Sequence, residues 1–127
     1  YFAKHNFGGK DWKGVTLLHD AMPWHDAEKD YEWSYWAKKN HLMLDTKSGH
    51  FFNRTDMAMS AAEAGVGVAL ARGALLGSEI EQGKLIAPFG SIDAHAGYFL
   101  LTQNESCAVR HFKRWLKAQV LGEDGVK

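Results

Sequence analysis

The sequence predicts an α/β domain with a largely parallel sheet. Two observations lead to this class. Short apolar, β-branched runs alternate with segments of helical periodicity along the chain, which is typical of strand–helix–strand units. Of the 127 residues, 46% are hydrophobic and 24% are charged, the ordinary balance of a globular protein, and this excludes intrinsic disorder as the main state.

The strands are expected where small and β-branched residues cluster. Residues 15–18 (VTLL) form the first run, which ends at the polar pair His19 and Asp20. Residues 66–71 (VGVALA) have the pattern of a buried strand. Three further runs predict strands at residues 49–53, 85–87 and 98–102.

Helical periodicity predicts four helices, at residues 27–40, 55–64, 74–82 and 106–121. Gly65 is expected to end the second of these helices. Asn104 or Ser106 is expected to cap the last. At the two ends of the chain, residues 1–6 are predicted to be the end of a helix, and residues 122–127 are expected to fray.

The charge balance limits what this chain can bind. Fifteen basic and fifteen acidic residues give a formal net charge of zero. Binding to nucleic acid or to an anionic membrane requires an excess of basic residues, so we expect this chain to bind neither. A single cysteine, Cys107, permits no internal disulfide and no cysteine-based zinc site, which favours a reducing compartment. The chain opens at Tyr1 without a signal peptide, and we expect it to be a piece of a longer protein.

The glycines of Gly65-Val66-Gly67 invite comparison with a dinucleotide-binding loop. Such a loop follows a strand and opens a helix, whereas these glycines follow a helix and open a strand. We therefore predict structural roles. Gly65 is expected to take the left-handed turn at the helix end, and Gly67 to let the chain enter the sheet directly.

Two histidine–aspartate pairs, His19-Asp20 and His25-Asp26, flank a proline loop and suggest a divalent metal. A structural metal site needs three or four ligands on rigid elements, and the sequence has no helical HExxH pair. Roles as loop polar groups or as hydrogen-bonding partners of a ligand are therefore favoured. A serine-hydrolase site is excluded because no GxSxG motif is present.

The junction of the strand at residues 49–53 with the helix at residues 55–64 is the most informative candidate site. The helix start brings free backbone N–H groups to the sheet edge where ligands bind in open α/β folds. Thr55 can cap this helix or offer its hydroxyl to a ligand carboxylate. On the preceding helix, Trp33 and Trp36 share a face, and a place in the core is favoured for both over a pocket wall.

Several motifs occur in an order that resembles the C-terminal effector-binding domain of LysR-type transcriptional regulators, in the branch of the glycine-cleavage and D-serine deaminase activators. The resemblance covers residues 1 to about 120. The motifs are TLLHD (16–20), EWSYW (32–36), FNRTDMA (52–58), AA with GVGVAL (61–62 and 65–70) and LIAPF (85–89).

The resemblance implies a two-lobed fold like that of the type 2 periplasmic binding proteins, with Rossmann-like lobes and an effector in the cleft between them. It implies that this chain is a partial domain. Residues 1–96 would form most of the second lobe, and residues 97–127 the crossing strand and the helix that returns to the first lobe. The N-terminal winged helix-turn-helix that binds DNA would lie outside this chain.

The resemblance also implies a set of effector-binding residues and no catalytic residue, metal or cofactor. An amino acid or small carboxylate is the expected effector. Its carboxylate would meet Thr55 and nearby N–H groups, and its ammonium would meet Asp20 or Asp56. The alternative for Arg54 is a surface pair with Asp56. The full expected set is His19, Asp20, Trp33, Arg54, Thr55, Asp56 and Tyr98.

The resulting expectation is a cytoplasmic, non-enzymatic sensing part of a regulator that forms a homodimer or tetramer and contacts no membrane. The aromatic helix at residues 27–40 or its neighbouring strand is the expected dimer contact, because Tyr and Trp favour interface cores. Two alternatives stay open. One is a periplasmic-type solute-binding protein of the same fold. The other is a metal-dependent hydrolase that uses His19, Asp20, His25 and Asp26.

Overall fold

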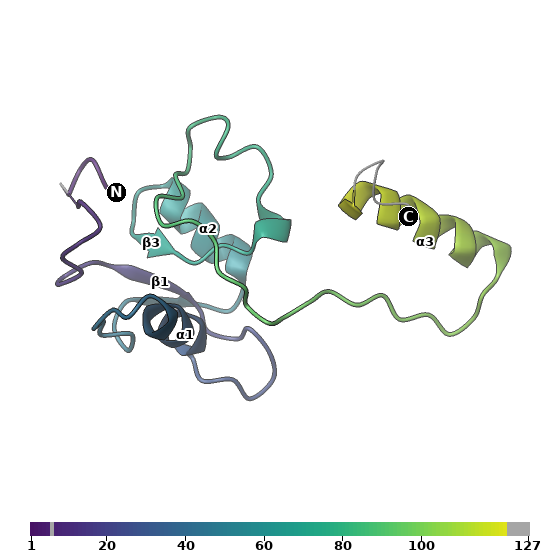
Figure 1. Ribbon diagram of the computed structural model, residues 1–127, viewed down its shortest axis with the longest axis horizontal. Coiled ribbons are helices and arrows are strands. Elements are labelled where there is room, and N and C mark those ends of the chain that lie inside the picture. The colour runs from purple at the N-terminus through teal and green to yellow at the C-terminus, as the bar shows by residue number, and fades with distance from the viewer. Residues whose placement is uncertain (6, 122–127) are drawn as a thin grey trace. The chain divides into compact units, whose positions relative to one another are not determined.

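The computed structural model describes residues 1–5 and 7–121, and the chain divides into two compact units, Tyr1–Ile92 and Asp93–Lys127 (Figure 1). The first unit contains the sheet, and the second contains one long helix. Residues 122–127, for which fraying was expected, lie outside the described residues. The assignment of residues 1–96 and 97–127 to two lobes stays a prediction.

The sheet of the first unit consists of three parallel strands, as expected for an α/β fold. They are β1 (Leu17–Asp20), β2 (His50–Phe52) and β3 (Val68–Ala69), in the order β2-β1-β3. In the central strand, Leu18 is paired with His50 on one side and with Ala69 on the other. The three strands therefore share one direction and end at the same edge of the sheet.

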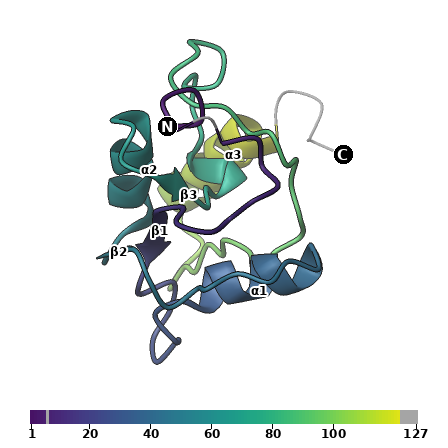
Figure 2. The same ribbon diagram turned by 90° about the vertical axis from the view of Figure 1, so that its left-hand side faces the viewer.

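Two helices cover opposite faces of this sheet (Figures 1 and 2). They are α1 (Tyr31–Lys39) and α2 (Thr55–Glu63). The placement follows from chirality, because the chain moves from β1 outward to β2 and then back past β1 to β3, and right-handed crossovers in opposite directions lie on opposite faces. The predicted parallel α/β layering is confirmed.

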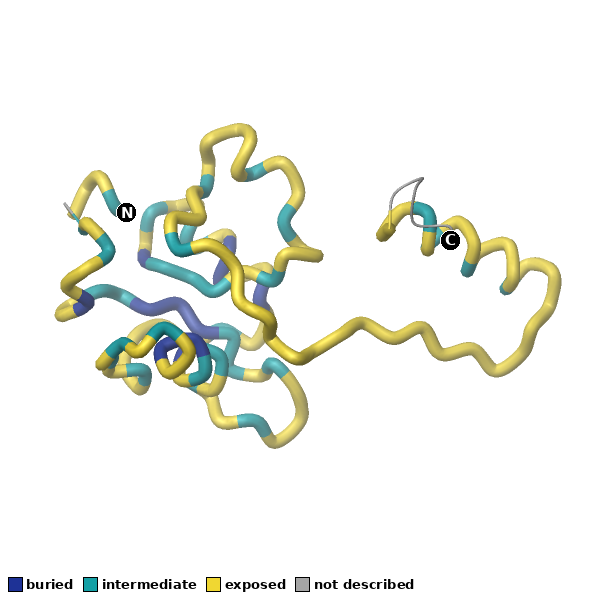
Figure 3. The backbone as a smooth tube through the Cα atoms, viewed as in Figure 1, coloured by how far each residue is buried: buried dark blue, intermediate teal, exposed yellow. Residues whose placement is uncertain are grey.

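The face of the sheet toward α1 is filled by tryptophans. Trp33 and Trp36 come from α1 and pack with Trp12 and with Leu17 of the central strand. The indole Nε1 of Trp33 donates a hydrogen bond to the carbonyl oxygen of Leu18 at 2.9 Å. Figure 3 shows a buried stretch along β1, and α1 buries Trp33, Trp36 and Ala37.

The opposite face of the sheet packs against α2. This helix buries Thr55, Ala58 and Met59, and its small residues let it lie close to the central strand. Leu18 is also fully buried, although its neighbour Leu17 faces α1. The central strand is thus apolar on both faces, as expected for a parallel strand covered on both sides.

The two glycines around Val66 have the structural roles predicted for them. Gly65 has a φ of +77°, the left-handed conformation that ends α2. A Cβ placed on Gly67 would lie 2.4 Å from the carbonyl oxygen of Thr16, so no larger residue fits beside β1 without a backbone shift.

Several predicted elements are wrong or shorter than expected. Residues 74–82 do not form an α-helix; a 3₁₀ helix, η1 (Gly73–Leu75), is followed by hydrogen-bonded turns, and glycines at 73, 77 and 83 disfavour a continuous helix. Residues 85–87 and 98–102 are not strands, because no described strand pairs with them. Residues 1–5 form a turn rather than a helix end.

The second unit contains α3 (Cys107–Leu121), close to its predicted bounds. Ser106 caps it, since its Oγ accepts the backbone N–H of Val109 at 3.3 Å, and Asn104 accepts the N–H of Ser106. Across residues 1–5 and 7–121, the structure contains no helix with the length and apolar character needed to cross a membrane.

We predict that Gly67→Ala lowers the free energy of unfolding by about 1–3 kcal/mol, the usual cost of overpacking. The added methyl group meets the carbonyl oxygen of Thr16, directly before β1, and this backbone oxygen cannot rotate away. Urea unfolding of the purified chain measures the change. Gly73→Ala is the matched control, because a Cβ there has no atom within 4 Å. Equal stabilities of the two variants would contradict the close approach of β3 to β1.

Candidate functional site

The candidate site lies at the edge of the sheet where the three strands end. In open α/β sheets this carboxyl edge is where ligands bind. Asp20 is the last residue of β1, and Thr55 is the first residue of the helix that follows β2. The Thr55 hydroxyl donates a hydrogen bond to Asp20 Oδ2 at 2.5 Å. Two of the residues expected in the site, 35 positions apart, are thus in direct contact.

Thr55 does not cap α2, contrary to one of its two expected roles. The N-cap residue is Arg54, in an extended conformation with φ −150°, and the cap makes no side-chain hydrogen bond. Thr55 is one residue inside the helix and buried, so its hydroxyl points across to β1. The Asp20 carboxylate also accepts the backbone N–H of Met22 at 3.0 Å, which orients it from a second direction.

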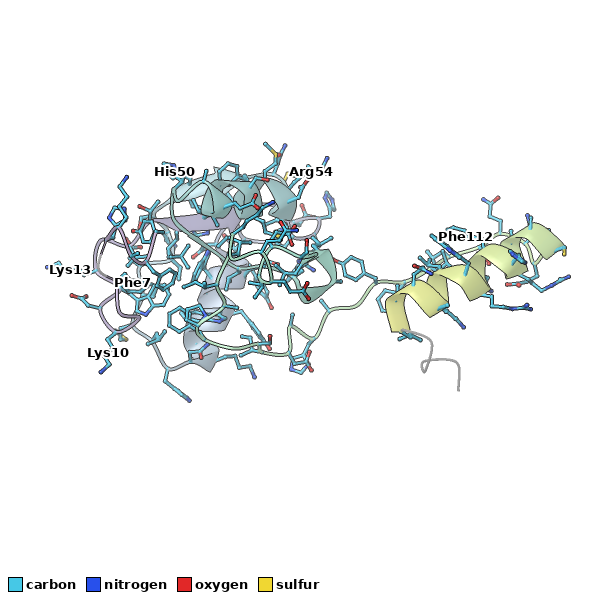
Figure 4. The ribbon with its side chains drawn as sticks, turned by 90° about the horizontal axis from the view of Figure 1, so that it is seen from above. Phe7, Lys10, Lys13, His50, Arg54 and Phe112 are labelled. Atoms are coloured by element: carbon cyan, nitrogen blue, oxygen red, sulfur yellow. The ribbon has the colours of Figure 1, made fainter. Side chains whose placement is uncertain are left out.

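Arg54 and Asp56 bind each other on the surface, which is the alternative stated for them. Arg54 Nε and Nη2 donate to the two carboxylate oxygens of Asp56 at 2.9 and 2.8 Å. Figure 4 shows Arg54 on the outside of its unit, and 70% of its side chain is exposed. The hydrogen bond from Arg54 lowers the pKa of Asp56, and backbone N–H groups of Asp56 and Met57 lower it further.

His19 points away from the carboxyl edge. Its ring is 1% exposed and stacks on Phe51 with 4.2 Å between the ring centroids. Nε2 lies 2.9 Å from the carbonyl oxygen of Ser48. A carbonyl oxygen only accepts, so Nε2 carries the proton. Burial lowers the pKa of His19, against the smaller opposing effects of the Ser48 hydrogen bond and the Asp30 charge.

Trp33 and Tyr98 belong to different units of the chain. Trp33 is 2% exposed and belongs to the core on the α1 face of the sheet. It therefore has the core position that the sequence favours over a pocket wall. Tyr98 belongs to the other unit and is 68% exposed. Within the first unit, Asp20 and Thr55 are the expected residues that touch each other at the carboxyl edge.

Two charged residues that sequence reasoning missed form an ion pair beside Asp20. Arg72, three residues after β3, donates through Nη2 to Oε1 of Glu32 at 2.5 Å. Both side chains are largely buried, at 26% and 19% exposed. Burial raises the pKa of Glu32, Arg72 lowers it, and the Asp20 charge raises it again. Forty positions separate the partners, and no local motif marks either of them.

The two histidine–aspartate pairs do not converge. His25 and Asp26 contact each other at 3.3 Å, and their side chains are 94% and 86% exposed. His19 is directed to Ser48, whereas Asp20 is bound to Thr55. In the described part of the chain, no three His, Cys, Asp or Glu side chains lie close enough together to hold one metal ion.

Comparison with curated proteins finds similar transcriptional regulators. The chain is 36% identical over 109 residues to the HTH-type transcriptional regulator DsdC of Escherichia coli (strain K12), covering 83% of this chain and 35% of that protein. It is 32% identical over 112 residues to the glycine cleavage system transcriptional activator of the same strain, covering 85% and 35%. The HTH-type transcriptional regulator TrpI of Pseudomonas aeruginosa is 29% identical over 101 residues, covering 77% and 34%.

The chain corresponds to only part of each of these relatives. It spans about a third of the length of the curated relatives it matches. No protein-family model matches the chain, and no solved structure matches it.

We predict that acidification below pH 6.5 lowers stability through His19. The folded state holds the neutral ring, so the unfolded state takes up the proton first, at the ordinary pKa of 6.5. This contribution is present above pH 6.5 and is lost as the pH falls toward the lowered pKa of the folded state. Urea unfolding at several pH values, compared with His19→Gln, measures it. The same pH profile for both proteins would contradict the prediction.

Proposed function

We propose that this chain, which belongs to the LysR-type transcriptional regulators, is part of the small-molecule-sensing domain of such a regulator. The observation that carries the proposal is the Asp20–Thr55 contact at the carboxyl edge of a parallel sheet, where open α/β folds bind ligands. A two-lobed fold of the type 2 periplasmic-binding-protein class agrees with the parallel sheet and its two covering helices.

A regulator is favoured over the other two candidate functions. The similar proteins are named as transcriptional regulators, and none is named as an enzyme or a transport protein. Arg54 and Asp56 neutralise each other, which leaves Asp20 with its two donors as the best-oriented anion of the expected set. We infer that Asp20 receives the ammonium group of an amino acid, because a charge-assisted hydrogen bond in a half-buried site is strong.

The mechanism we propose is a shift between two conformations. The effector binds one arrangement of the lobes more tightly, and the change in geometry reaches a DNA-binding domain elsewhere in the protein. Assembly as a homodimer would use the outer side of α1, where Tyr31 and Tyr35 stack at 6.2 Å. The protein would act in the cytoplasm, where the bacterial DNA lies.

The test uses the whole regulator that contains this chain. A thermal-shift screen of the common amino acids identifies the effector as the compound that raises the melting temperature, since a ligand of the native state stabilises it. A screen in which no amino acid has any effect would overturn the amino-acid assignment.

We predict that Thr55→Ala weakens the response to that amino acid about tenfold, because Asp20 loses the donor that orients its carboxylate. DNA affinity without effector is expected to stay unchanged. Reporter dose–response curves and DNA binding by fluorescence anisotropy measure the two quantities.

Thr55→Ser keeps the hydroxyl and is expected to retain most of the response. Ser60→Ala is the matched control, because this hydroxyl of the same helix donates to the Asp56 carbonyl oxygen at the exposed surface of α2. A normal dose–response curve for Thr55→Ala would remove Thr55 from the site.

A further inference from the structure

We propose that Arg72 binds the carboxylate of the ligand, and that Glu32 occupies its place on Arg72 when no ligand is bound. The ligand class that fits is the zwitterion of an α-amino acid, held by Asp20 at its ammonium end and by Arg72 at its carboxylate end. The inference rests on the proposed function, because it concerns the same edge of the sheet.

Arg72 lies near the end of the central strand. It follows β3 at the carboxyl edge, and Glu32 lies in the first turn of α1 beside the core residue Trp33. β1 and β3 are paired in parallel at Leu18 and Ala69, so Asp20 lies two residues and Arg72 three residues beyond this pair, at the same edge of the sheet. The charge of Asp20 also raises the pKa of Glu32. An arginine with only a quarter of its side chain exposed is rare without a defined partner.

The guanidinium group of Arg72 has N–H donors that Glu32 does not occupy. Arginine presents five N–H donors in a planar fork that matches a carboxylate at two points. In the described part of the chain, Arg72 makes one side-chain hydrogen bond, from Nη2 to a single oxygen of Glu32. A ligand carboxylate that bound through both of its oxygens would bind Arg72 more strongly than Glu32 does.

The other groups that could bind the ligand carboxylate already have partners within the chain. Arg54 already makes two hydrogen bonds to Asp56 at the surface. The backbone N–H groups of Asp56 and Met57 lower the pKa of the Asp56 carboxyl group, and the Thr55 hydroxyl donates to Asp20. Sequence reasoning placed the ligand carboxylate at these groups. The structure uses them internally, and Arg72 is the half-buried cation that remains beside Asp20.

The charges then favour an amino acid over a simple acid or amine. Asp20 and Glu32 are two carboxylates against the one guanidinium of Arg72. An ammonium group offsets the charge of Asp20, and the ligand carboxylate substitutes for Glu32 on Arg72. A simple carboxylic acid would be repelled by Asp20, and a simple amine would leave the Arg72–Glu32 pair closed.

The experiment measures binding of glycine to the whole regulator by isothermal titration calorimetry. Glycine carries both charged groups and nothing else, and methylamine and acetate each carry one. We expect Arg72→Gln to weaken glycine binding at least about tenfold, and Arg72→Lys to restore part of it. Methylamine is expected to bind the wild type and Arg72→Gln equally.

Glu32→Gln separates competition from a structural role. If Glu32 competes for Arg72, its removal strengthens glycine binding by about threefold or more, as expected for loss of a charge-assisted bond. A pair that only supports the fold would give weaker binding in both single variants. In the double variant the gain must vanish, because no guanidinium is left to be released. Lys84→Gln, in the exposed pair with Glu63 at 3.9 Å, is the control.

The possible failures are distinct. If Arg72→Gln binds glycine like the wild type while Asp20→Asn does not bind it, Arg72 is not the carboxylate group and the proposed function stands. If Glu32→Gln binds glycine more weakly than the wild type, the competition is wrong. If neither glycine nor any other common amino acid binds the wild type or Glu32→Gln, the amino-acid site itself is overturned, and the inference falls with it.

Discussion

The hydrogen bond from Trp33 to the carbonyl of Leu18 is the contact on which the first unit depends. It attaches α1 to the central strand by a directional bond, whereas the surrounding contacts of Trp12, Trp36 and Leu17 are apolar and adaptable. An unpaired indole or carbonyl in this core would cost about 1–3 kcal/mol. Since Glu32 precedes Trp33, the same bond also determines where the Glu32 carboxylate lies relative to Arg72 and the end of β1.

The central strand combines structural and functional roles along four residues. Leu17 and Leu18 are buried on opposite faces, His19 closes the contact with β2, and Asp20 emerges at the edge. Backbone approach on both sides is very close, because a Cβ on Gly49 would meet the Leu17 oxygen just as one on Gly67 meets that of Thr16. The carboxylate at the end of this strand therefore starts from a rigid backbone, which is what precise binding requires.

The features that follow from local pattern could be predicted from the sequence, and those that follow from long-range contact could not. Periodicity and glycine placement predict α2, its end at Gly65 and the parallel class of sheet. The Arg72–Glu32 pair joins residues 40 positions apart and leaves no local signal. Residues 98–102 have the local pattern of a strand but do not form one. β-type residues form a strand only where a neighbouring strand supplies hydrogen bonds.

The tryptophan cluster gives the first unit an intrinsic spectroscopic signal. Trp12, Trp33 and Trp36 lie with their ring centroids 5.4 to 5.9 Å apart and edge to face. Indoles this close, held in a chiral arrangement, couple electronically and produce a circular dichroism signal that free indoles lack. Trp24 and Trp115 make their ring contacts with Tyr31 and Phe112 instead. Trp33 and Trp36 both belong to α1, so loss of the part of this signal that depends on Trp12 would mark the separation of α1 from the segment before β1.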